Sequence, residues 1–311
     1  MNGIKLIACS SNKALSEEIA AYLGLRLTDI LITTFSDGEV RVQINESVRG
    51  YHVYVIASLS NPVNHNIMEL LLTIDAIRRS SPKEITAVIP YYAYGRQDRQ
   101  DRPRTPISAK VMADLLQKVG ADRVIAVDLH SPQIQGFFDI PVEHLTAIPV
   151  LHDYIRKNLV LENPIVVSPD AGGVKRARDL ANRLGCGIGV ILKRRPEPNK
   201  AEVMDVVGDL EGKDAIIVDD IIDTAGTLTA AANLLMNKGV KRVIACATHG
   251  IFSGPAIDRL NSSPIEKVIV TNTLPVYEKK FNKLEIVSIA PLIGETIRRV
   301  REGSSVSSLF S

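Results

Sequence analysis

The sequence predicts an α/β protein built from two similar domains, each with a mainly parallel sheet flanked by helices. Short apolar runs alternate with amphipathic stretches along the 311 residues. The apolar runs are continuous and do not alternate with polar residues, which is typical of strands covered on both faces in a parallel sheet. A stretch of the first half also recurs in the second half, and this favours two domains of one type.

The expected elements follow in chain order. The first residues, "MNGIKLIACSSNK", are expected to form a strand that runs into a turn, and the helix that follows carries "SEEIAAYLG" and stops at Gly24. The stretch "NPVNHNIMELLLTIDAIRRS" (61–80) predicts a helix with Asn61 as its cap and Pro62 at its first position. Further strands are expected in the apolar runs "ITAVIPYY", "RVIAVDLH", "NPIVVSPD", "DAIIVDD" and "RVIACATHG".

The internal repeat joins "ADLLQKVGADRVIAVDLH" (113–130) and "ANLLMNKGVKRVIACATH" (232–249), which align without gaps. Each copy has a helix ending at a glycine, a strand with Arg-Val-Ile-Ala, and a final histidine. We expect domains of residues 1–146 and 147–296. The serine-rich tail, from about residue 297 to 311, is either frayed or docked, and we expect it to pack back on the first domain.

Composition and net charge exclude several classes of function. A net charge of +2, with 45% apolar and 23% charged residues, argues against a general nucleic-acid or membrane binder. The three cysteines are too scattered for a zinc motif or a disulfide framework, so a reducing, cytoplasmic setting is expected. We find no secretory signal and no apolar run near the ~18 residues that a membrane span needs.

A run of acids at the end of an apolar strand carries the clearest chemistry. In "DAIIVDDIIDTAGTLTAAANLLMNKG" (214–239) the strand is expected to end at Asp219–Asp220, and a helix to begin near Gly226–Thr227. The connection therefore offers backbone N–H groups and hydroxyls at a helix N-terminus, which suits an anion. The acids can accept hydrogen bonds from hydroxyls or hold a hydrated magnesium ion. A sugar phosphate meets both demands, whereas an ordinary helix cap explains a single aspartate only.

The turn "VDDIIDTAGT" closely resembles the 5-phosphoribosyl-diphosphate-binding motif of the phosphoribosyltransferase fold. Four more stretches are similar to those of ribose-phosphate diphosphokinases (phosphoribosyl-diphosphate synthetases) and keep that family's order; they are "FSDGEVRVQINESVRG", "YYAYGRQDRQDRPRTPISAK", "DLHSPQIQGFFDIP" and "VVSPDAGGVKRARDLA". The resemblance covers essentially the whole chain. It implies two phosphoribosyltransferase-like domains.

The resemblance also implies which residues bind the two substrates. Those implied for ribose 5-phosphate are Arg195, Asp219, Asp220, Asp223, Thr224, Ala225, Gly226 and Thr227. Those implied for ATP are Phe35, Asp37, Gly38 and Glu39 of "FSDGE" and Arg96, Gln97, Asp98 and Arg99 of "GRQDR". The arginines suit a polyphosphate because guanidinium forks bind phosphate oxygens bidentately, although an isolated charge run is more often a solvated loop.

Metal and catalytic residues are implied in the same way. The resemblance assigns His130 and Asp170 to a magnesium ion, although chemistry alone ranks Asp128 above His130 because magnesium prefers oxygen. It assigns Lys193 and Arg195 of "ILKRRPEPNK" to a loop that closes over the transferring phosphate, where charge must be stabilised. No residue stands out as a general base.

Taken together, the resemblance implies a magnesium-dependent transfer of diphosphate from ATP to ribose 5-phosphate, with release of AMP. The phosphate-activated, ADP-inhibited class of the family (class I) is hexameric, and this chain has residues like those of that class's regulatory site, namely Ser47, Arg49, Ser305, Ser307 and Phe310. We therefore expect a homohexamer regulated by phosphate and ADP.

Three other functions are weighed against this one. A phosphoribosyltransferase would use the same acidic turn but would not need a loop such as "GRQDRQD". A non-catalytic regulatory subunit would not need Lys193 and Arg195. A nucleic-acid binder is disfavoured because the basic residues alternate with acids and aromatic residues make up only 5% of the chain.

Overall fold

The computed structural model describes residues 3–194, 203–276 and 279–310. The chain forms two compact units. The first unit contains Met1–Thr146, Thr273–Pro275 and Ser288–Ser311, and the second contains Ala147–Asn272 and Val276–Val287. The C-terminal segment that belongs to the first unit thus begins at Ser288, well before residue 297, because the whole helix that follows packs there.

The first unit has a five-stranded sheet in the order β1-β4-β5-β6-β7, and all its neighbouring strands are parallel. Its strands are β1 (Ile4–Ala8), β4 (His52–Ile56), β5 (Glu84–Ile89), β6 (Arg123–Val127) and β7 (Val142–Leu145). Each of β4, β5 and β6 is buried along nearly its whole length, as the continuous apolar runs predict. Successive strands follow one another across this sheet in a single direction.

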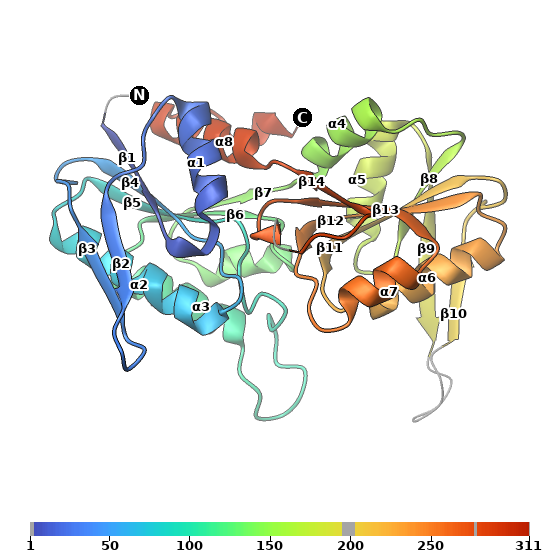
Figure 1. Cartoon of the computed structure of the whole chain (residues 1–311), viewed down its shortest axis with the longest axis horizontal. Coiled ribbons are helices and arrows are strands. Elements are labelled where there is room, and N and C mark those ends of the chain that lie inside the picture. Colours follow the sequence, from blue (N-terminus) through green and yellow to red (C-terminus); the bar gives the residue numbers. More distant parts are fainter. Residues whose placement is uncertain (1–2, 195–202, 277–278, 311) are drawn as a thin grey trace. The chain divides into compact units, whose positions relative to one another are not determined.

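Helices cover both faces of this sheet, with α1 and α8 on one face and α2 and α3 on the other (Figure 1). They are α1 (Lys13–Leu23), α2 (Val63–Arg79), α3 (Ser108–Val119) and α8 (Ala290–Glu302). Gly24 and Gly120 end α1 and α3 with positive φ angles of 64° and 119°, conformations that favour glycine. Helix α2 begins at Val63, one residue later than expected, because Pro62 is extended with ψ 106°.

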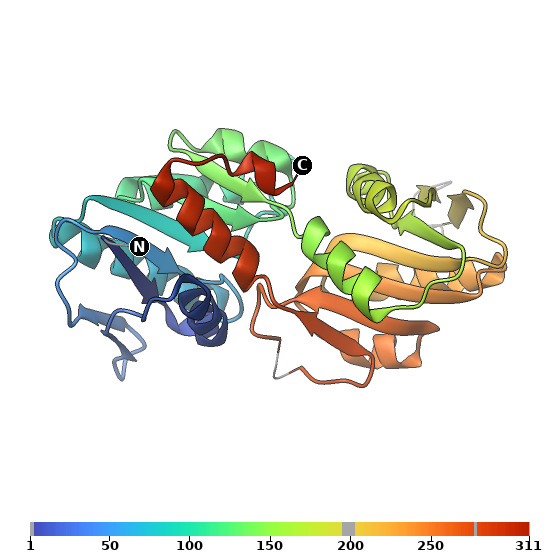
Figure 2. The ribbon, with the colours of Figure 1, turned by 90° about the horizontal axis from the view of Figure 1, so that it is seen from above.

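Helix α8 joins the last part of the chain to the first. It lies against α1 in both views (Figures 1 and 2) and buries Leu292, Ile293 and Ile297. Its Glu295 carboxylate accepts a hydrogen bond of 3.2 Å from the Tyr22 hydroxyl of α1. Gly294 leaves room for the Tyr22 ring, since a Cβ there would lie 2.4 Å from Tyr22 Cδ1. Helix α8 is therefore docked on the first unit through a close helix–helix contact with α1.

The second unit has a seven-stranded sheet in the order β10-β9-β8-β11-β12-β13-β14. Its strands are β8 (Pro164–Ser168), β9 (Gly187–Arg194), β10 (Val203–Val207), β11 (Asp214–Ile222), β12 (Arg242–Gly250), β13 (Ile265–Thr271) and β14 (Leu284–Val287). All pairs are parallel except β9 with β10. The helices are α4 (Ile148–Asn158), α5 (Val174–Leu184), α6 (Gly226–Asn237) and α7 (Ala256–Ser262), two on each face (Figure 1).

The order of the second sheet reverses at its centre. From β8 the chain passes through α5 to β9 on one side, whereas from β11 it passes through α6 to β12 on the other side. Strands β8 and β11 are parallel neighbours, so their carboxyl ends lie side by side at the point where the two helices diverge. In open α/β sheets, ligands bind at such a switch point. The expected strand-and-helix pattern is confirmed in both units, and the second unit alone has this reversal.

Candidate active site

The acidic turn, residues 219–227, lies at the carboxyl end of β11. The strand continues to Ile222, past the two acids at which it was expected to end, because its pairing with β12 extends to Gly250. Helix α6 begins at Gly226, as predicted, after Ala225 in a left-handed conformation with φ 58°. In the described chain, no backbone carbonyl accepts from the N–H groups of Gly226, Thr227 and Leu228. These groups are available to an anion, and the helix dipole favours negative charge there.

One arginine, Arg176, partly neutralises the negative charge of the consecutive acids Asp219 and Asp220. Arg176 Nη1, from α5, lies 3.4 Å from Asp219 Oδ1 and 3.6 Å from Asp220 Oδ1. The side chains of Arg176 and Asp220 are 18% and 7% exposed. Burial and the adjacent Asp220 raise the pKa of Asp219, and Arg176 opposes this shift. Two adjacent like charges, one of them buried, require a cation at this place.

Two residues after β12 and on α7 hold the turn itself. The Ser253 hydroxyl donates to Asp223 Oδ1, and the Ser253 N–H donates to the Asp223 carbonyl at 3.1 Å. Arg259 Nη1 donates to the Thr224 carbonyl at 3.0 Å. Gly226 is tightly enclosed, since a Cβ there would lie 3.2 Å from Arg259 Nη1. The turn is therefore held from outside, while its N–H groups are left for a ligand.

A glycine turn, residues 168–174, lies at the same switch point and follows β8. The Ser168 hydroxyl donates to the Asp170 carbonyl at 2.7 Å, and the Gly173 N–H donates to Asp170 Oδ1 at 3.0 Å. A Cβ on Gly173 would lie 2.8 Å from Ser168 Oγ, so only glycine fits without a shift. This turn leads into α5, whose Arg176 reaches the acids of the neighbouring strand. The acidic turn predicted to bind the sugar and the turn that contains the predicted metal ligand Asp170 thus follow neighbouring strands at the switch point of the second sheet.

An arginine loop, residues 95–107, and His130 form a pocket in the first unit. Its volume is about 340 Å³, and its lining residues are Arg96, Gln97, Asp98, Arg99, Asp101, Thr105, Pro106 and His130. The loop is anchored at Gln97, whose carbonyl accepts from the Ala109 N–H at 3.1 Å and whose side chain accepts from the Ser108 hydroxyl. His130 is exposed and faces this pocket, whereas Asp128 is buried with φ 39°. The pocket combines guanidinium donors with carboxylates, as a metal–polyphosphate site requires.

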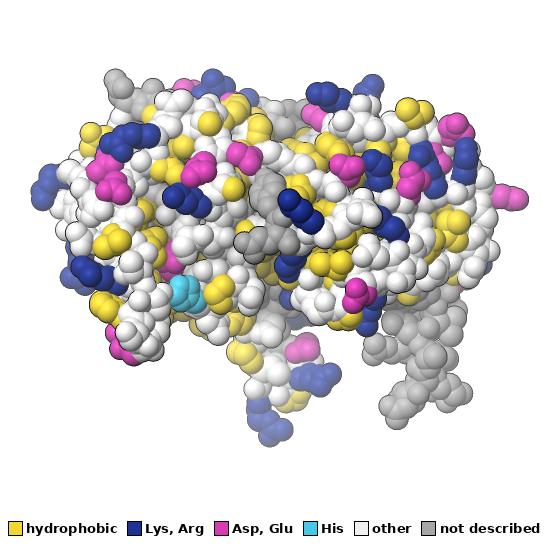
Figure 3. All heavy atoms as spheres, in the orientation of Figure 1, with side chains coloured by type: hydrophobic (Ala, Val, Ile, Leu, Met, Phe, Trp, Pro, Cys, Tyr) yellow, Lys and Arg dark blue, Asp and Glu magenta, His cyan; other side chains and the backbone are white. Residues whose placement is uncertain are grey.

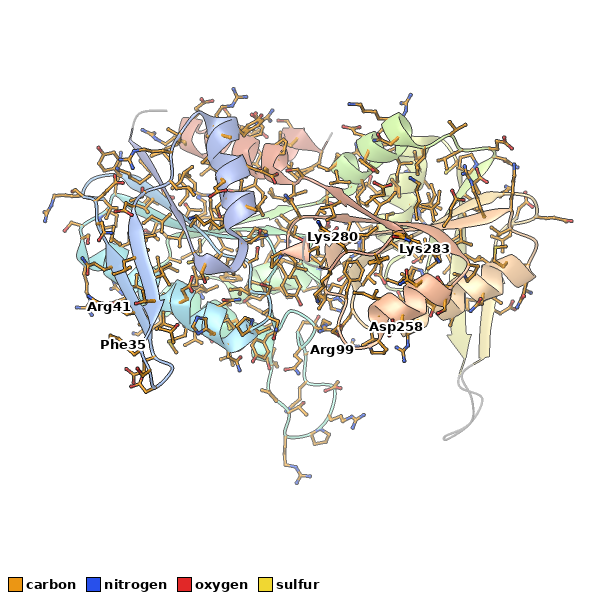
Figure 4. All side chains as sticks on the ribbon, in the orientation of Figure 1. Phe35, Arg41, Arg99, Asp258, Lys280 and Lys283 are labelled. Atoms are coloured by element: carbon orange, nitrogen blue, oxygen red, sulfur yellow. The ribbon has the colours of Figure 1, made fainter. Side chains whose placement is uncertain are left out.

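The "FSDGE" segment lies elsewhere in the first unit. It is the tip of an antiparallel hairpin formed by β2 (Ile30–Thr34) and β3 (Val40–Ile44), which packs against α2. Phe35 is 51% exposed, and the Glu39 N–H donates to Asp37 Oδ1 at 3.1 Å. Figure 4 shows Phe35 on the hairpin, well away from Arg99 on the arginine loop. The hairpin residues do not line the pocket, so one chain does not bring its two expected ATP segments together.

The remaining predicted residues divide between the units. His130 belongs to the first unit and Asp170 to the second. Within the described ranges, no group of three or more His, Cys, Asp or Glu side chains is arranged to hold a metal ion. Lys193 lies in β9 opposite Met204 of β10, and Arg195 lies outside the described residues. An ion at either predicted ligand would have to complete its coordination with substrate oxygens and water.

The predicted regulatory residues all belong to the first unit. Ser47 and Arg49 are exposed, and Phe310 is half-buried. Ser305 Oγ and Ser307 Oγ lie 2.9 Å apart. A pocket of about 390 Å³ follows the end of α8, and its lining residues are Arg123, Glu143, Val300, Gly303, Ser304, Val306 and Ser307. Ser307 is therefore at a site that can admit a small ligand.

Three residues of the site escaped sequence reasoning, namely Arg176, Ser253 and Arg259. Each acts across elements that are distant in sequence, so no local pattern reveals it. The sequence does indicate a cation near Asp219 and Asp220, because two consecutive acids at the end of an apolar strand require one. Arg176 lies on the helix that follows the glycine turn, and knowing the order of the strands would have singled it out.

Comparisons with known proteins give the family. Residues 4–120 match the N-terminal domain of ribose phosphate pyrophosphokinase, and residues 194–311 match the phosphoribosyl synthetase-associated domain. Ribose-phosphate pyrophosphokinase from Aquifex aeolicus is 87% identical over 311 residues, covering 100% of both chains. This chain belongs to the ribose-phosphate pyrophosphokinase family.

More distant ribose-phosphate pyrophosphokinases agree over the full length. The protein from Bacillus subtilis is 54% identical over 310 residues, with 99% of this chain and 97% of the relative covered. A crystal structure of phosphoribosylpyrophosphate synthetase from Mycobacterium smegmatis has a TM-score of 0.92 at 44% identity, covering 97% of this chain and 100% of that one. The expected family is thereby confirmed. Among the described helices, none has the length and apolar character needed to cross a membrane.

Proposed function

We propose that this chain transfers the β,γ-diphosphate of ATP to the C1 hydroxyl of ribose 5-phosphate. The products are 5-phospho-α-D-ribose 1-diphosphate, a precursor for nucleotide biosynthesis, and AMP. The observation that carries the proposal is full-length membership of the ribose-phosphate pyrophosphokinase family, together with a sugar-phosphate turn at the switch point of the second sheet. In the transfer, the C1 oxygen forms a bond to the β-phosphorus of ATP, the bond from that phosphorus to the α-phosphate oxygen breaks, and the C1 hydroxyl loses its proton.

The sugar is held by the second unit. Its 5-phosphate binds the N–H groups of residues 226–228 and the hydroxyls of Thr224 and Thr227, and its ring hydroxyls donate to Asp219 and Asp220. Arg259 and Ser253 keep the turn in the binding conformation. Lys193 and Arg195 stabilise the negative charge that develops on the transferring phosphates, which is the main demand of phosphoryl-type transfer.

The nucleotide's phosphates are held by the arginine loop of the first unit. Arg96 and Arg99 line its pocket beside Asp98, Asp101 and His130. These carboxylates supply the oxygen ligands that magnesium prefers, so the pocket fits a magnesium–triphosphate group. We propose His130 of this pocket, and separately Asp170 of the second unit, as magnesium ligands. When bound, magnesium would neutralise phosphate charge during the transfer.

None of the lining residues of the pocket is Phe or Tyr, and the tyrosines nearby, Tyr91 and Tyr94, line a separate pocket that shares Arg96 and Gln97. We propose that the hairpin of a second copy supplies Phe35 to the adenine ring, with Asp37, Gly38 and Glu39 at its tip. An apolar face supports self-association. Exposed apolar side chains occur on the hairpin, on α2, which packs against it, and on α3, which packs against α2; they are Leu31, Phe35, Met68, Leu72, Val111 and Leu115. Exposed apolar side chains on neighbouring elements are typical of protein–protein contacts.

A hexamer regulated by phosphate and ADP, acting in the cytoplasm, completes the proposal. Ser47, Arg49, Ser305, Ser307 and Phe310 are the proposed regulatory residues, and the pocket at Ser307 supports this assignment. Nucleic acid is not an expected partner. Figure 3 shows positive and negative side chains interspersed over each unit on the visible face, and a nucleic-acid site would need a field of one sign.

The decisive test is to incubate the protein with ATP, ribose 5-phosphate and magnesium, and to separate the nucleotides by chromatography. AMP should form in equal amount to 5-phosphoribosyl 1-diphosphate, and neither should form without the sugar. A protein that made no AMP, but released diphosphate from the activated sugar when a purine base was added, would be a phosphoribosyltransferase and would refute the proposal.

A mixing experiment tests the shared nucleotide site. Phe35→Ala and Arg99→Ala each remove one half of the site and should each raise the KM for ATP. If the hairpin of one copy serves the loop of another, dissociating and reassembling the two variants together should recover about a quarter of wild-type activity, because about half of the pairs are mixed and each mixed pair has one intact site. If the mixture were no more active than its components, the two halves would have to come from the same chain.

A further inference from the structure

The guanidinium of Arg176 lies between the acidic turn and the glycine turn. Its Nη1 atom is 3.4 Å from Asp219 Oδ1 and 3.6 Å from Asp220 Oδ1, and it is 3.8 Å from the position that a Cβ would take on Gly173. Arg176 therefore contacts the acidic turn while it packs against the glycine turn. Helix α5 fixes this placement, because Ala177 and Leu180 anchor it in the core of the second unit.

The backbone brings both carboxylates to this one cation. Consecutive side chains of a strand normally point to opposite faces of the sheet. Here the Asp220 N–H donates to Asp219 Oδ1 at 2.8 Å, which folds the Asp219 side chain back along the chain. Both Oδ1 atoms then lie within reach of the same guanidinium nitrogen. The arrangement presents two adjacent carboxylates as one acceptor group.

The contacts of Arg176 are those of a loose ion pair. Distances of 3.4 and 3.6 Å exceed the roughly 2.7–2.9 Å of a charge-assisted hydrogen bond. The arginine therefore balances the charge of the pair without a short hydrogen bond to either Oδ1 atom. The Asp219 side chain is also 30% exposed, so solvent or a ligand can approach it. Two neighbouring hydroxyls of a sugar ring are the donors that match two such acceptors.

We infer that Arg176 is a positioning residue for the ribose ring, which holds Asp219 and Asp220 as a paired acceptor for two neighbouring sugar hydroxyls. This inference rests on the proposed function and deepens it, because it ties recognition of the vicinal diol to a third residue. The arginine acts through the acids and not on the phosphates of the sugar or nucleotide. Its removal should therefore weaken ribose binding without weakening ATP binding.

The test compares Arg176→Gln with Arg178→Gln in the full-length protein. Arg178 is exposed on the same helix two positions further on, and residues so spaced do not share a helix face. Ribose 5-phosphate binding is measured by calorimetry without ATP, and the KM values of both substrates are measured in the AMP assay. Arg176→Gln should weaken ribose 5-phosphate binding by about tenfold or more, because the hydrogen bonds from the sugar hydroxyls to the charged carboxylates are strong and depend on how the carboxylates are held. It should leave the KM for ATP within about twofold. Arg178→Gln should change neither.

The sugar hydroxyl itself provides a second readout. With 2-deoxyribose 5-phosphate, which lacks one of the two hydroxyls, the loss caused by Arg176→Gln should be clearly smaller than with ribose 5-phosphate. An equal loss with both sugars would show that Arg176 acts on the turn as a whole and would overturn the inference, as would unchanged ribose 5-phosphate binding.

Separate controls distinguish a failure of folding and a failure of the proposed function from a failure of the inference about Arg176. If Arg176→Gln fails to fold, Arg176→Lys keeps the charge with a different reach and decides the matter against Arg178→Lys. A selective loss of ribose 5-phosphate affinity in Arg176→Lys supports the inference, and wild-type affinity refutes it. A wild-type protein that forms no AMP would refute the proposed function itself. A wild-type protein that forms AMP, beside an Arg176→Gln variant with normal sugar affinity, would refute only the role of Arg176.

Discussion

Replacing Glu295 by glutamine should destabilise the first unit in a pH-dependent manner. The carboxylate accepts from Arg299 Nε at 2.8 Å and from the Tyr22 hydroxyl at 3.2 Å, and it pairs with Arg298 Nη2 at 2.7 Å. Chiefly because of Arg298 and Arg299, the pKa of Glu295 falls from its ordinary value of 4.5 to about 2. The Glu295 side chain itself is only 12% exposed.

The magnitude follows from the pKa. At about 1.4 kcal/mol for each tenfold change in acidity, a fall from 4.5 to about 2 corresponds to about 3 kcal/mol of folding free energy. Arg298 is 48% exposed, and solvent screening reduces the expected figure to about 2 kcal/mol. Because the folded pKa is the lower one, this stabilisation is fully present above pH 4.5 and is lost as the pH falls through 4.5 towards about 2.

Urea unfolding followed by far-ultraviolet circular dichroism measures the effect at a fixed protein concentration. At pH 7, Glu295→Gln should lower the free energy of unfolding by about 2 kcal/mol, and the difference from wild type should shrink progressively towards pH 3. Asp75→Asn is the control, since it removes an exposed pair with Arg79 and should cost less than about 0.5 kcal/mol. A difference of the same size at pH 7 and pH 3 would refute the electrostatic account and leave packing as the cause.

Three further predictions concern the second unit. Asp219→Asn should raise the Tm at pH 7, because the raised pKa of Asp219 means that folding disfavours its charged form, and this gain should vanish below about pH 4, where the acid is protonated in both states. The same variant should raise the KM for ribose 5-phosphate. Thermal scans that show no stabilisation at pH 7 would contradict the argument from burial. Gly226→Ala should weaken ribose 5-phosphate binding in calorimetry by about tenfold, because its Cβ would press on Arg259 at 3.2 Å, whereas Gly187→Ala, with no atom within 4 Å, serves as the control and should bind normally. Lys193→Ala should lower kcat in the AMP assay by roughly a hundredfold or more with little change in the KM for ribose 5-phosphate, since it acts on the transition state, and a selective rise in that KM would make it a binding residue instead.

Much of the fold was predictable because its signals are local. Continuous apolar runs marked β5, β6, β8, β11 and β12, and glycines marked the ends of α1 and α3. The start of α6 at Gly226 was also readable, since a strand that ends in acids and a turn of small residues leaves few alternatives. These features depend on residues within one or two turns of the chain.

The parts that were not predictable depend on topology. The sequence analysis assigned Phe35 and Arg99 to one nucleotide site, but the hairpin and the arginine loop lie apart in the folded chain (Figure 4). Likewise, the pairing of Arg176 with Asp219 follows from the placement of β8 beside β11, which no local pattern specifies. Strand order decides which loops become neighbours, and it is set by long-range packing.

The return of α8 to the first unit has a consequence for synthesis on the ribosome. Tyr22 and Glu295, which meet across α1 and α8, are separated by 273 positions in the chain. The amino-terminal part of the first unit is therefore synthesised early, but it cannot complete its packing until α8 has been synthesised. Most of the second unit is synthesised before α8. We expect nascent chains arrested before residue 290 to hold a protease-resistant second unit beside an incompletely protected first one.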